Sequence, residues 1–83
     1  MRNNEQNKLL VEIGKVLIQR RSELKLPRTQ LALELGVDEK QIRRIERGEV
    51  STNILTLFKI CHVLNLDIAF LSNIEIGDDI MNI

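Results

Sequence analysis

The sequence contains few of the residues that stabilise or functionalise many small domains. It has one cysteine, one proline, two phenylalanines and neither tryptophan nor tyrosine. The single cysteine, Cys61, cannot form an intramolecular disulfide, and this fits a reducing compartment such as the cytoplasm. The near absence of aromatic side chains argues against a base-stacking surface for single-stranded nucleic acid. No apolar run approaches the roughly 20 residues of a membrane span, and the polar start MRNNEQNK carries no secretory signal.

Length and charge narrow the class of protein further. A chain of 83 residues has room for one domain. A domain this small has a small core and therefore low stability, and such domains are commonly stabilised by oligomerisation. The net charge is zero, but residues 1–65 carry a net charge of +4 and residues 66–83 a net charge of −4. This asymmetry predicts a basic body with an acidic end, which is compatible with a nucleic-acid partner.

Four segments carry apolar residues at helical spacing, and each is bounded by residues that begin or end helices. Pro27, Gly36 and Gly48 separate the segments. Asp38 and Asn53 are suited to cap the helices that follow them. The predicted helices span residues 8–25, 28–35, 39–47 and 54–64.

The segment after the fourth helix has a different pattern. Residues 66–76, LDIAFLSNIEI, alternate polar and apolar side chains, which favours a strand, with a short helix over 67–72 as the alternative. The stripe of Leu57, Phe58, Cys61 and Leu64 is expected first in the core, with a dimer surface as the alternative for part of it. We therefore predict an all-α domain over 8–72, carrying a strand at its C-terminal end, between a flexible N-terminus at 1–7 and a short acidic tail at 73–83.

The second and third predicted helices form the outline of a helix-turn-helix, since both are short and a glycine turn joins them. On the third helix, Ile42 and Ile45 point inward. The opposite side carries four cations: Lys40, Arg43, Arg44 and Arg47. A DNA major groove admits one α-helix, and basic and polar side chains read base edges there. The pattern predicts that residues 39–47 read a major groove.

Two motifs support a family resemblance. Leu31-Ala32 stands five residues before Gly36-Val37, and the third helix ends in IERG, Ile45 to Gly48. These residues resemble the Cro/repressor superfamily, also called the Xre family, over roughly residues 10–72. The resemblance implies a compact lambda-repressor-like domain of four to five helices that binds operator DNA as a dimer.

The resemblance also implies roles for individual residues. The residues expected to contact bases are Glu39, Lys40, Arg43 and Arg44, with Arg43 between base and backbone. Those expected to contact phosphates are Arg28, Gln30, Gln41, Arg47, Thr52 and Asn53. Arg28 is a departure, because the family often has glutamine there. Arg21 and Glu46 occupy the positions of a structural ion pair. For Glu39 two roles stay open: accepting a hydrogen bond from cytosine N4, or complementing the helix dipole.

A narrower resemblance covers residues 53–73, NILTLFKICHVLNLDIAFLSN, which are similar to the HipB-type antitoxins. In those proteins a strand follows the fourth helix and pairs with its copy in the second subunit. The resemblance implies a dimer interface formed by Ile68, Phe70 and Leu71, and a kinase-like toxin as partner. An exposed apolar strand on a monomer would be an aggregation hazard, so pairing across a two-fold axis is physically reasonable.

Other candidate sites are weak. Cys61 and His62 are adjacent on a helix, so their side chains diverge and do not converge on one ion. Asp78 and Asp79 are expected to be solvated. We find no nucleophile paired with a base, and we expect no metal, no cofactor, no small-molecule ligand and no enzymatic activity.

The sequence therefore predicts a cytoplasmic, homodimeric regulator that binds double-stranded DNA and acts as a repressor. The alternatives are an antitoxin whose main role is binding a toxin, a stand-alone phage or restriction-system controller, and a protein-interaction module that keeps the fold without the DNA.

Overall fold

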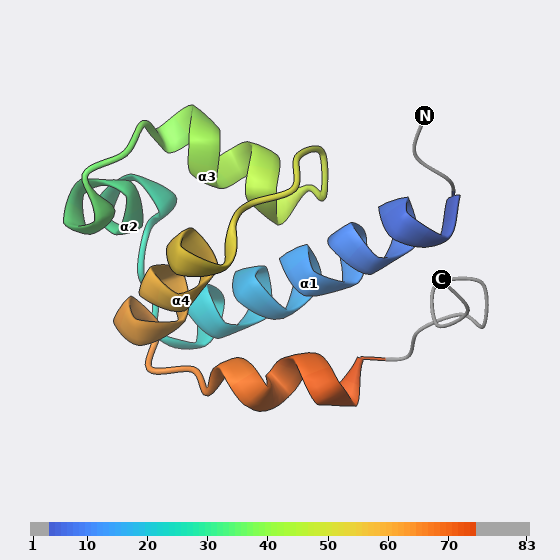
Figure 1. The fold of residues 1–83 in the computed structure, drawn as a ribbon. Coiled ribbons are helices and arrows are strands. Elements are labelled where there is room, and N and C mark those ends of the chain that lie inside the picture. Colours follow the sequence, from blue (N-terminus) through green and yellow to red (C-terminus); the bar gives the residue numbers. More distant parts are fainter. Residues whose placement is uncertain (1–3, 75–83) are drawn as a thin grey trace.

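The computed structural model describes residues 4–74. Within this part of the chain there are four α-helices and a final 3-10 helix: α1 (Asn4–Glu23), α2 (Arg28–Leu35), α3 (Glu39–Glu46), α4 (Ile54–Val63) and η1 (Ile68–Asn73). Figure 1 shows α2 and α3 together on one side of the long α1, with η1 running along the opposite side. No helix among the described residues combines the length and the apolar character needed to cross a membrane.

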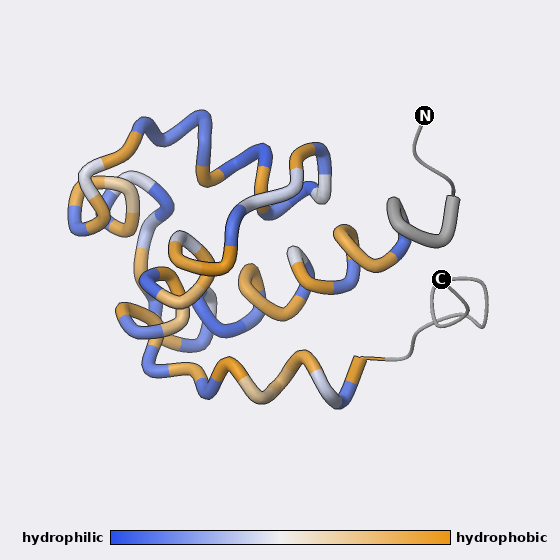
Figure 2. The backbone as a smooth tube through the Cα atoms, viewed as in Figure 1, coloured by the Kyte–Doolittle hydropathy of each residue, from blue (hydrophilic) through white to orange (hydrophobic). Residues whose placement is uncertain are grey.

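One apolar core joins the four α-helices. Each α-helix contributes at least one side chain, and α4 is the most apolar of them in Figure 2, whereas α3 is mostly hydrophilic. The buried residues are Leu17, Leu31, Ala32, Ile42, Ile45, Leu57, Ile60, Cys61 and Leu64. The buried residues of α3 are Ile42, Ile45 and Glu46. Its other residues are not part of the core, so they can contact a partner.

All four α-helices end in the same backbone arrangement. One residue is left-handed at the end of each helix, directly after α2 and two residues after the last residue of α1, α3 and α4. The amide groups of this residue and of the next one bond back to carbonyls in the last turn. Gly36 and Gly48 adopt this conformation at φ 71° and 73°, whereas Lys25 and Asn65 adopt it without being glycine, at φ 54° and 53°. This is the Schellman arrangement, which satisfies carbonyls that a helix end leaves open. It also reverses the chain sharply, so α2 and α3 can pack against each other across a very short turn.

The predicted helices are confirmed, with shifts at their ends. The first helix begins at Asn4 instead of residue 8 and ends at Glu23 instead of 25, because the left-handed turn at Lys25 closes it before Pro27. Asp38 caps α3 by accepting from the amide of Lys40 at 3.1 Å. Asn53 caps α4 in the same way, with its side chain accepting from the amide of Thr56 at 2.8 Å.

The strand that was favoured over 66–76 is wrong for the residues that the structure describes, and the alternative of a short helix over 67–72 agrees with the structure. Ile68–Asn73 form a 3-10 helix, and Asp67 caps it by accepting from the amide of Ala69 at 2.9 Å. The partly buried residues Ile68, Leu71 and Ile74 recur every three positions, which matches the three residues per turn of a 3-10 helix. Residues 75 and 76 of the predicted strand, and most of the predicted acidic tail, lie outside the described residues.

Two glycines permit close contact between α1 and the end of α3. A β-carbon at Gly14 would overlap the backbone carbonyl of Glu46, and it would lie 2.7 Å from the carbonyl carbon. A β-carbon at Gly48 would lie 2.7 Å from the backbone nitrogen of Val11. Contacts below 3 Å with backbone atoms require the helices to move apart. Gly14 therefore lets α1 and α3 approach each other, which outweighs its weak helix propensity.

Candidate nucleic-acid interface

The turn between α2 and α3 fixes how α3 is presented. Gly36 ends α2 in the left-handed conformation, and Asp38 starts α3 two residues later. Leu31 and Ala32 on α2 and Ile42 on α3 are buried in the same core. With its apolar side held in this way, α3 exposes Lys40 and Arg44, two of the four residues that were predicted to contact bases.

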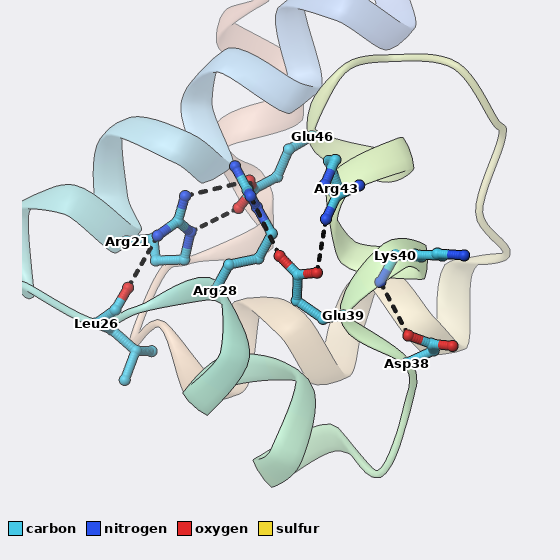
Figure 3. A network of polar contacts seen from close by, with 8 residues as sticks. All are labelled: Arg21, Leu26, Arg28, Asp38, Glu39, Lys40, Arg43 and Glu46. Carbon is cyan, nitrogen blue, oxygen red and sulfur yellow. Dashed lines mark hydrogen bonds and ion pairs between the residues drawn. The ribbon is translucent and has the colours of Figure 1, made fainter.

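Lys40 and Arg44 lie on this exposed side of α3. They are four residues apart, so they sit one above the other on one face of the helix. Both residues are exposed, and neither side chain has a hydrogen bond or an ion pair with another residue of the described part. Figure 3 shows the Lys40 side chain pointing away from the neighbouring polar network. These two cations are free to contact an anionic partner.

Beneath the exposed side lies a buried ion pair between Arg21 of α1 and Glu46 of α3. Arg21 Nε donates to Glu46 Oε2 at 2.7 Å, and Arg21 Nη2 donates to Oε1 at 3.2 Å. Arg21 Nη1 also donates to the backbone carbonyl of Leu26 at 3.0 Å. The Glu46 side chain is only 2% exposed. The structure thus brings together the two residues proposed as a structural pair, in a bidentate geometry that favours strong binding.

Arg28 of α2 extends this pair toward the surface. Its Nε donates to Glu46 Oε1 at 3.0 Å and its Nη1 donates to Glu39 Oε2 at 3.3 Å. Hydrogen bonding to Glu46, and secondarily to Glu39, raises the pKa of the Arg28 guanidinium. Arg28 was predicted to contact a phosphate, but in this structure two of its nitrogens are engaged by carboxylates. Its side chain is 33% exposed, so one edge still reaches solvent.

Glu39 lies between two arginines at the start of α3. It accepts from Arg28 through Oε2, and from Arg43 Nη2 through Oε1 at 2.8 Å (Figure 3). The Glu39 and Arg43 side chains are 28% and 39% exposed. Two residues predicted to contact bases are therefore paired with each other, and the network runs continuously from Arg21 on α1 to Arg43 on α3.

The other residues predicted to contact phosphates differ in how exposed they are and in whether their side chains are already paired. Gln41 is exposed in the first turn of α3. Arg47 is exposed at the C-terminal end of α3, where it pairs loosely with Glu49 at 3.6 Å. Gln30 is exposed on α2 and donates to Glu34 Oε2 at 3.4 Å. Asn53 uses its side-chain oxygen to cap α4, and Thr52 beside it is partly buried.

The residues predicted at a dimer interface are not the most exposed apolar ones. Ile68, Phe70 and Leu71 are partly buried and pack against the core. The first turns of α4 instead expose Ile54, Leu55 and Phe58, at 67%, 60% and 55%. The expectation that Phe58 lies in the core is wrong, because α4 turns Leu57, Ile60, Cys61 and Leu64 inward and leaves this side uncovered.

Cys61 and His62 diverge as expected from their positions. Cys61 is buried, and burial raises the pKa of its thiol, with a smaller contribution from Asp67. His62 is exposed. Among residues 4–74 no group of three or more His, Cys, Asp or Glu side chains is arranged to hold a metal ion.

Sequence reasoning missed several contacts around the site. Glu39 and Arg43 have the i,i+4 spacing of a helical ion pair, so that contact had a visible signal. The Arg28–Glu39 contact joins two helices and has no signal in a single sequence. Arg20 was also missed: its Nε donates to the carbonyl of Leu64 at 2.9 Å, which ties α1 to the end of α4.

Comparison with known protein families gives one match. The helix-turn-helix family HTH_3 matches residues 17–71, which include α2, α3, α4 and the network around Glu46. No curated protein matches the chain closely. Proteins of this family are typically regulators without enzymatic activity. The match covers most of the chain and contains both helices of the motif, so the protein belongs to the HTH_3 helix-turn-helix family of Cro/C1 (Xre) type, a family of DNA-binding domains of transcriptional regulators.

Proposed function

We propose that this protein is a sequence-specific regulator that represses transcription, including that of its own gene, by placing α3 in the major groove of an operator. The observation that carries the proposal is the division of α3 into two sides. Ile42, Ile45 and Glu46 hold the helix in place, while Lys40 and Arg44 are exposed and have no side-chain partner among residues 4–74. A rigidly held helix with free cations on its outer side suits direct contact with base edges.

The decisive experiment is a mobility-shift titration with the DNA upstream of the protein's own gene. The expected result is tight binding that survives an excess of non-specific competitor and weakens as salt increases, because displaced counterions accompany phosphate contacts. Titrations at two salt concentrations distinguish binding that weakens with salt from binding that does not depend on salt. Absence of any preference over competitor DNA would contradict autoregulation.

We further propose that the regulator acts as a two-fold dimer, which would place two copies of α3 in successive major grooves. The interface would include Ile68, Phe70 and Leu71, and the adjoining apolar surface of α4. Support comes from a hollow that joins the two segments, since it is lined by residues from Phe58 to Ile68. Burying large exposed apolar side chains would also help a chain of 83 residues, whose own core is small.

A substitution of Phe58 by glutamate tests the dimer. The side chain is 55% exposed, so a charge there is expected to leave the fold intact and to shift the protein from dimer to monomer. Sedimentation velocity at micromolar concentration provides the readout. The control is Lys59→Gln, which makes the same change in net charge at an exposed residue of the same helix that does not line this hollow. A wild-type protein that sediments only as a monomer would contradict the proposal.

Two alternatives remain distinct from this function. In the antitoxin alternative, the main partner is a kinase-like toxin and the protein also represses the toxin's operon. This alternative loses support because the strand expected after α4 is a 3-10 helix. In the second alternative, the fold is a protein-interaction module that does not bind DNA, and the zero net charge is the feature that favours it. A toxin gene beside this one would favour the first alternative.

A further inference from the structure

Glu39 is an anionic residue at the start of a helix that is expected to meet polyanionic DNA. Its two carboxylate oxygens are both engaged, with Arg28 Nη1 at 3.3 Å and with Arg43 Nη2 at 2.8 Å. All three side chains are between one quarter and two fifths exposed, so the cluster lies at the protein surface (Figure 3). We call Arg28, Glu39 and Arg43 the Glu39 clasp.

The clasp changes how the two arginines can interact with DNA. Attraction to any DNA sequence comes from cations that neutralise phosphates and release counterions. Arg28 and Arg43 are already paired with a carboxylate, so a phosphate must compete with Glu39 for each of them. Lys40 and Arg44 have no such competitor among the described residues. The clasp therefore removes part of the non-specific attraction from the reading side of the protein.

The clasp also distinguishes between bases. A carboxylate accepts hydrogen bonds and donates none when ionised. In the major groove the exocyclic amino groups of cytosine and adenine are the only base donors, whereas guanine and thymine present acceptors there. A base on the contacted strand that offers its amino group to Glu39 compensates for the loosened arginine contacts. One that offers an acceptor leaves the carboxylate facing another electronegative atom.

We propose that Glu39 determines specificity in two ways: it restrains Arg28 and Arg43 so that DNA in general is bound more weakly, and it selects, on the strand that it contacts, a base that presents an amino group, cytosine N4 before adenine N6. The selection rests on the proposed function, because it requires α3 to lie in a major groove. The restraint does not require an operator.

Glu39→Gln tests the restraint, because glutamine keeps the size of the side chain and removes its charge. The matched control is Glu34→Gln on α2, which removes the same charge from an exposed residue whose only described contact is with Gln30. The probe is a random-sequence duplex, followed by fluorescence anisotropy over a range of salt concentrations. Glu39→Gln is expected to bind about 3- to 10-fold more tightly than Glu34→Gln, with a salt slope steeper by roughly 1 to 2, since each added phosphate contact contributes about 0.9. Equal affinities and slopes for the two variants would overturn the restraint.

The selection is tested with single base-pair changes across each half-site of the operator. The wild-type protein is expected to require cytosine, or less strictly adenine, on one strand at one position. Glu39→Ala is expected to lose that preference while it keeps the others, because alanine offers no acceptor whereas glutamine can itself pair with adenine. If every preference survives the substitution, the selection is wrong. If the wild-type protein prefers no sequence at all, the proposed function and the selection fail together, and the random-duplex comparison alone still decides the restraint.

Discussion

Replacement of both Lys40 and Arg44 by glutamate is expected to reduce operator affinity by more than a hundredfold without unfolding the protein. Each well-placed contact with a base edge contributes about 1–3 kcal/mol of discrimination. Two lost contacts therefore correspond to about 2–6 kcal/mol, where each 1.4 kcal/mol is a factor of ten. Reversed charges on the reading side would also repel phosphates. The fold should survive because both side chains are exposed and hold no described partner.

The control for this variant is Lys8→Glu with Lys15→Glu. Both lysines are exposed on α1, and the change in net charge is the same. Operator binding is measured by anisotropy, and stability by urea unfolding, where we expect shifts within about 0.5 kcal/mol. An equal loss of binding in the two double variants would show that overall charge, and not α3, accounts for the affinity. Full binding by the Lys40 and Arg44 variant would exclude α3 as the reading helix.

Glu46→Ala is expected to destabilise the fold by about 3 kcal/mol, at the lower end of the cost of breaking a buried ion pair. The lost side chain is 2% exposed and accepts from both Arg21 and Arg28. Its removal would leave two guanidinium groups without their shared carboxylate. The Arg28 side chain is 33% exposed, so water can hydrogen-bond to its guanidinium and reduce the loss of stability. Because a domain of this size has little stability to spare, much of the protein would unfold at moderate denaturant concentration.

Urea unfolding followed by circular dichroism measures this effect. Glu49→Ala is the control, because Glu49 is three residues away, exposed, and only loosely paired with Arg47 at 3.6 Å. Pairs of this kind contribute little, so the control is expected to remain within about 0.5 kcal/mol of the wild type. A Glu46→Ala protein as stable as the control would mean that apolar packing alone orients α3.

The sequence predicted the parts of the fold that depend on local chemistry. Gly36 and Gly48 each ended a helix, and Asp38 and Asn53 each began one, because these residues act within a few positions of themselves. Lys25 shows the limit of this reasoning. A lysine in a left-handed conformation has no signal in the sequence, so the end of α1 was placed two residues late.

The segment after α4 was mispredicted because it is short. Over six residues, Ile68, Phe70 and Leu71 satisfy a period of two almost as well as a period of three. The choice is made by packing against α1 and α4, which a single sequence does not contain. Phe58 was misplaced for a related reason, since periodicity gives the apolar side of a helix but not how much of that side its neighbours cover.

The candidate site, too, has some features that the sequence predicted and others that depend on how the helices pack. The positions of Lys40 and Arg44 on the outer side of α3 followed from helical geometry once Ile42 and Ile45 were assigned to the core. The engagement of Arg28 with both Glu46 and Glu39 depends on how α2 and α3 pack. Sequence reasoning therefore found the cations of the site, but it did not predict which of them are already paired.

The two-sided construction of α3 has a consequence for how new DNA targets can arise. Ile42, Ile45 and Glu46 carry the structural contacts of the helix, whereas Lys40, Gln41 and Arg44 are exposed and carry none within the described part. Substitutions at the outer positions change the chemistry offered to the groove at little cost to folding. The domain is thus suited to acquiring new operators by mutation, and a library restricted to these three outer positions is a practical starting point for redesign.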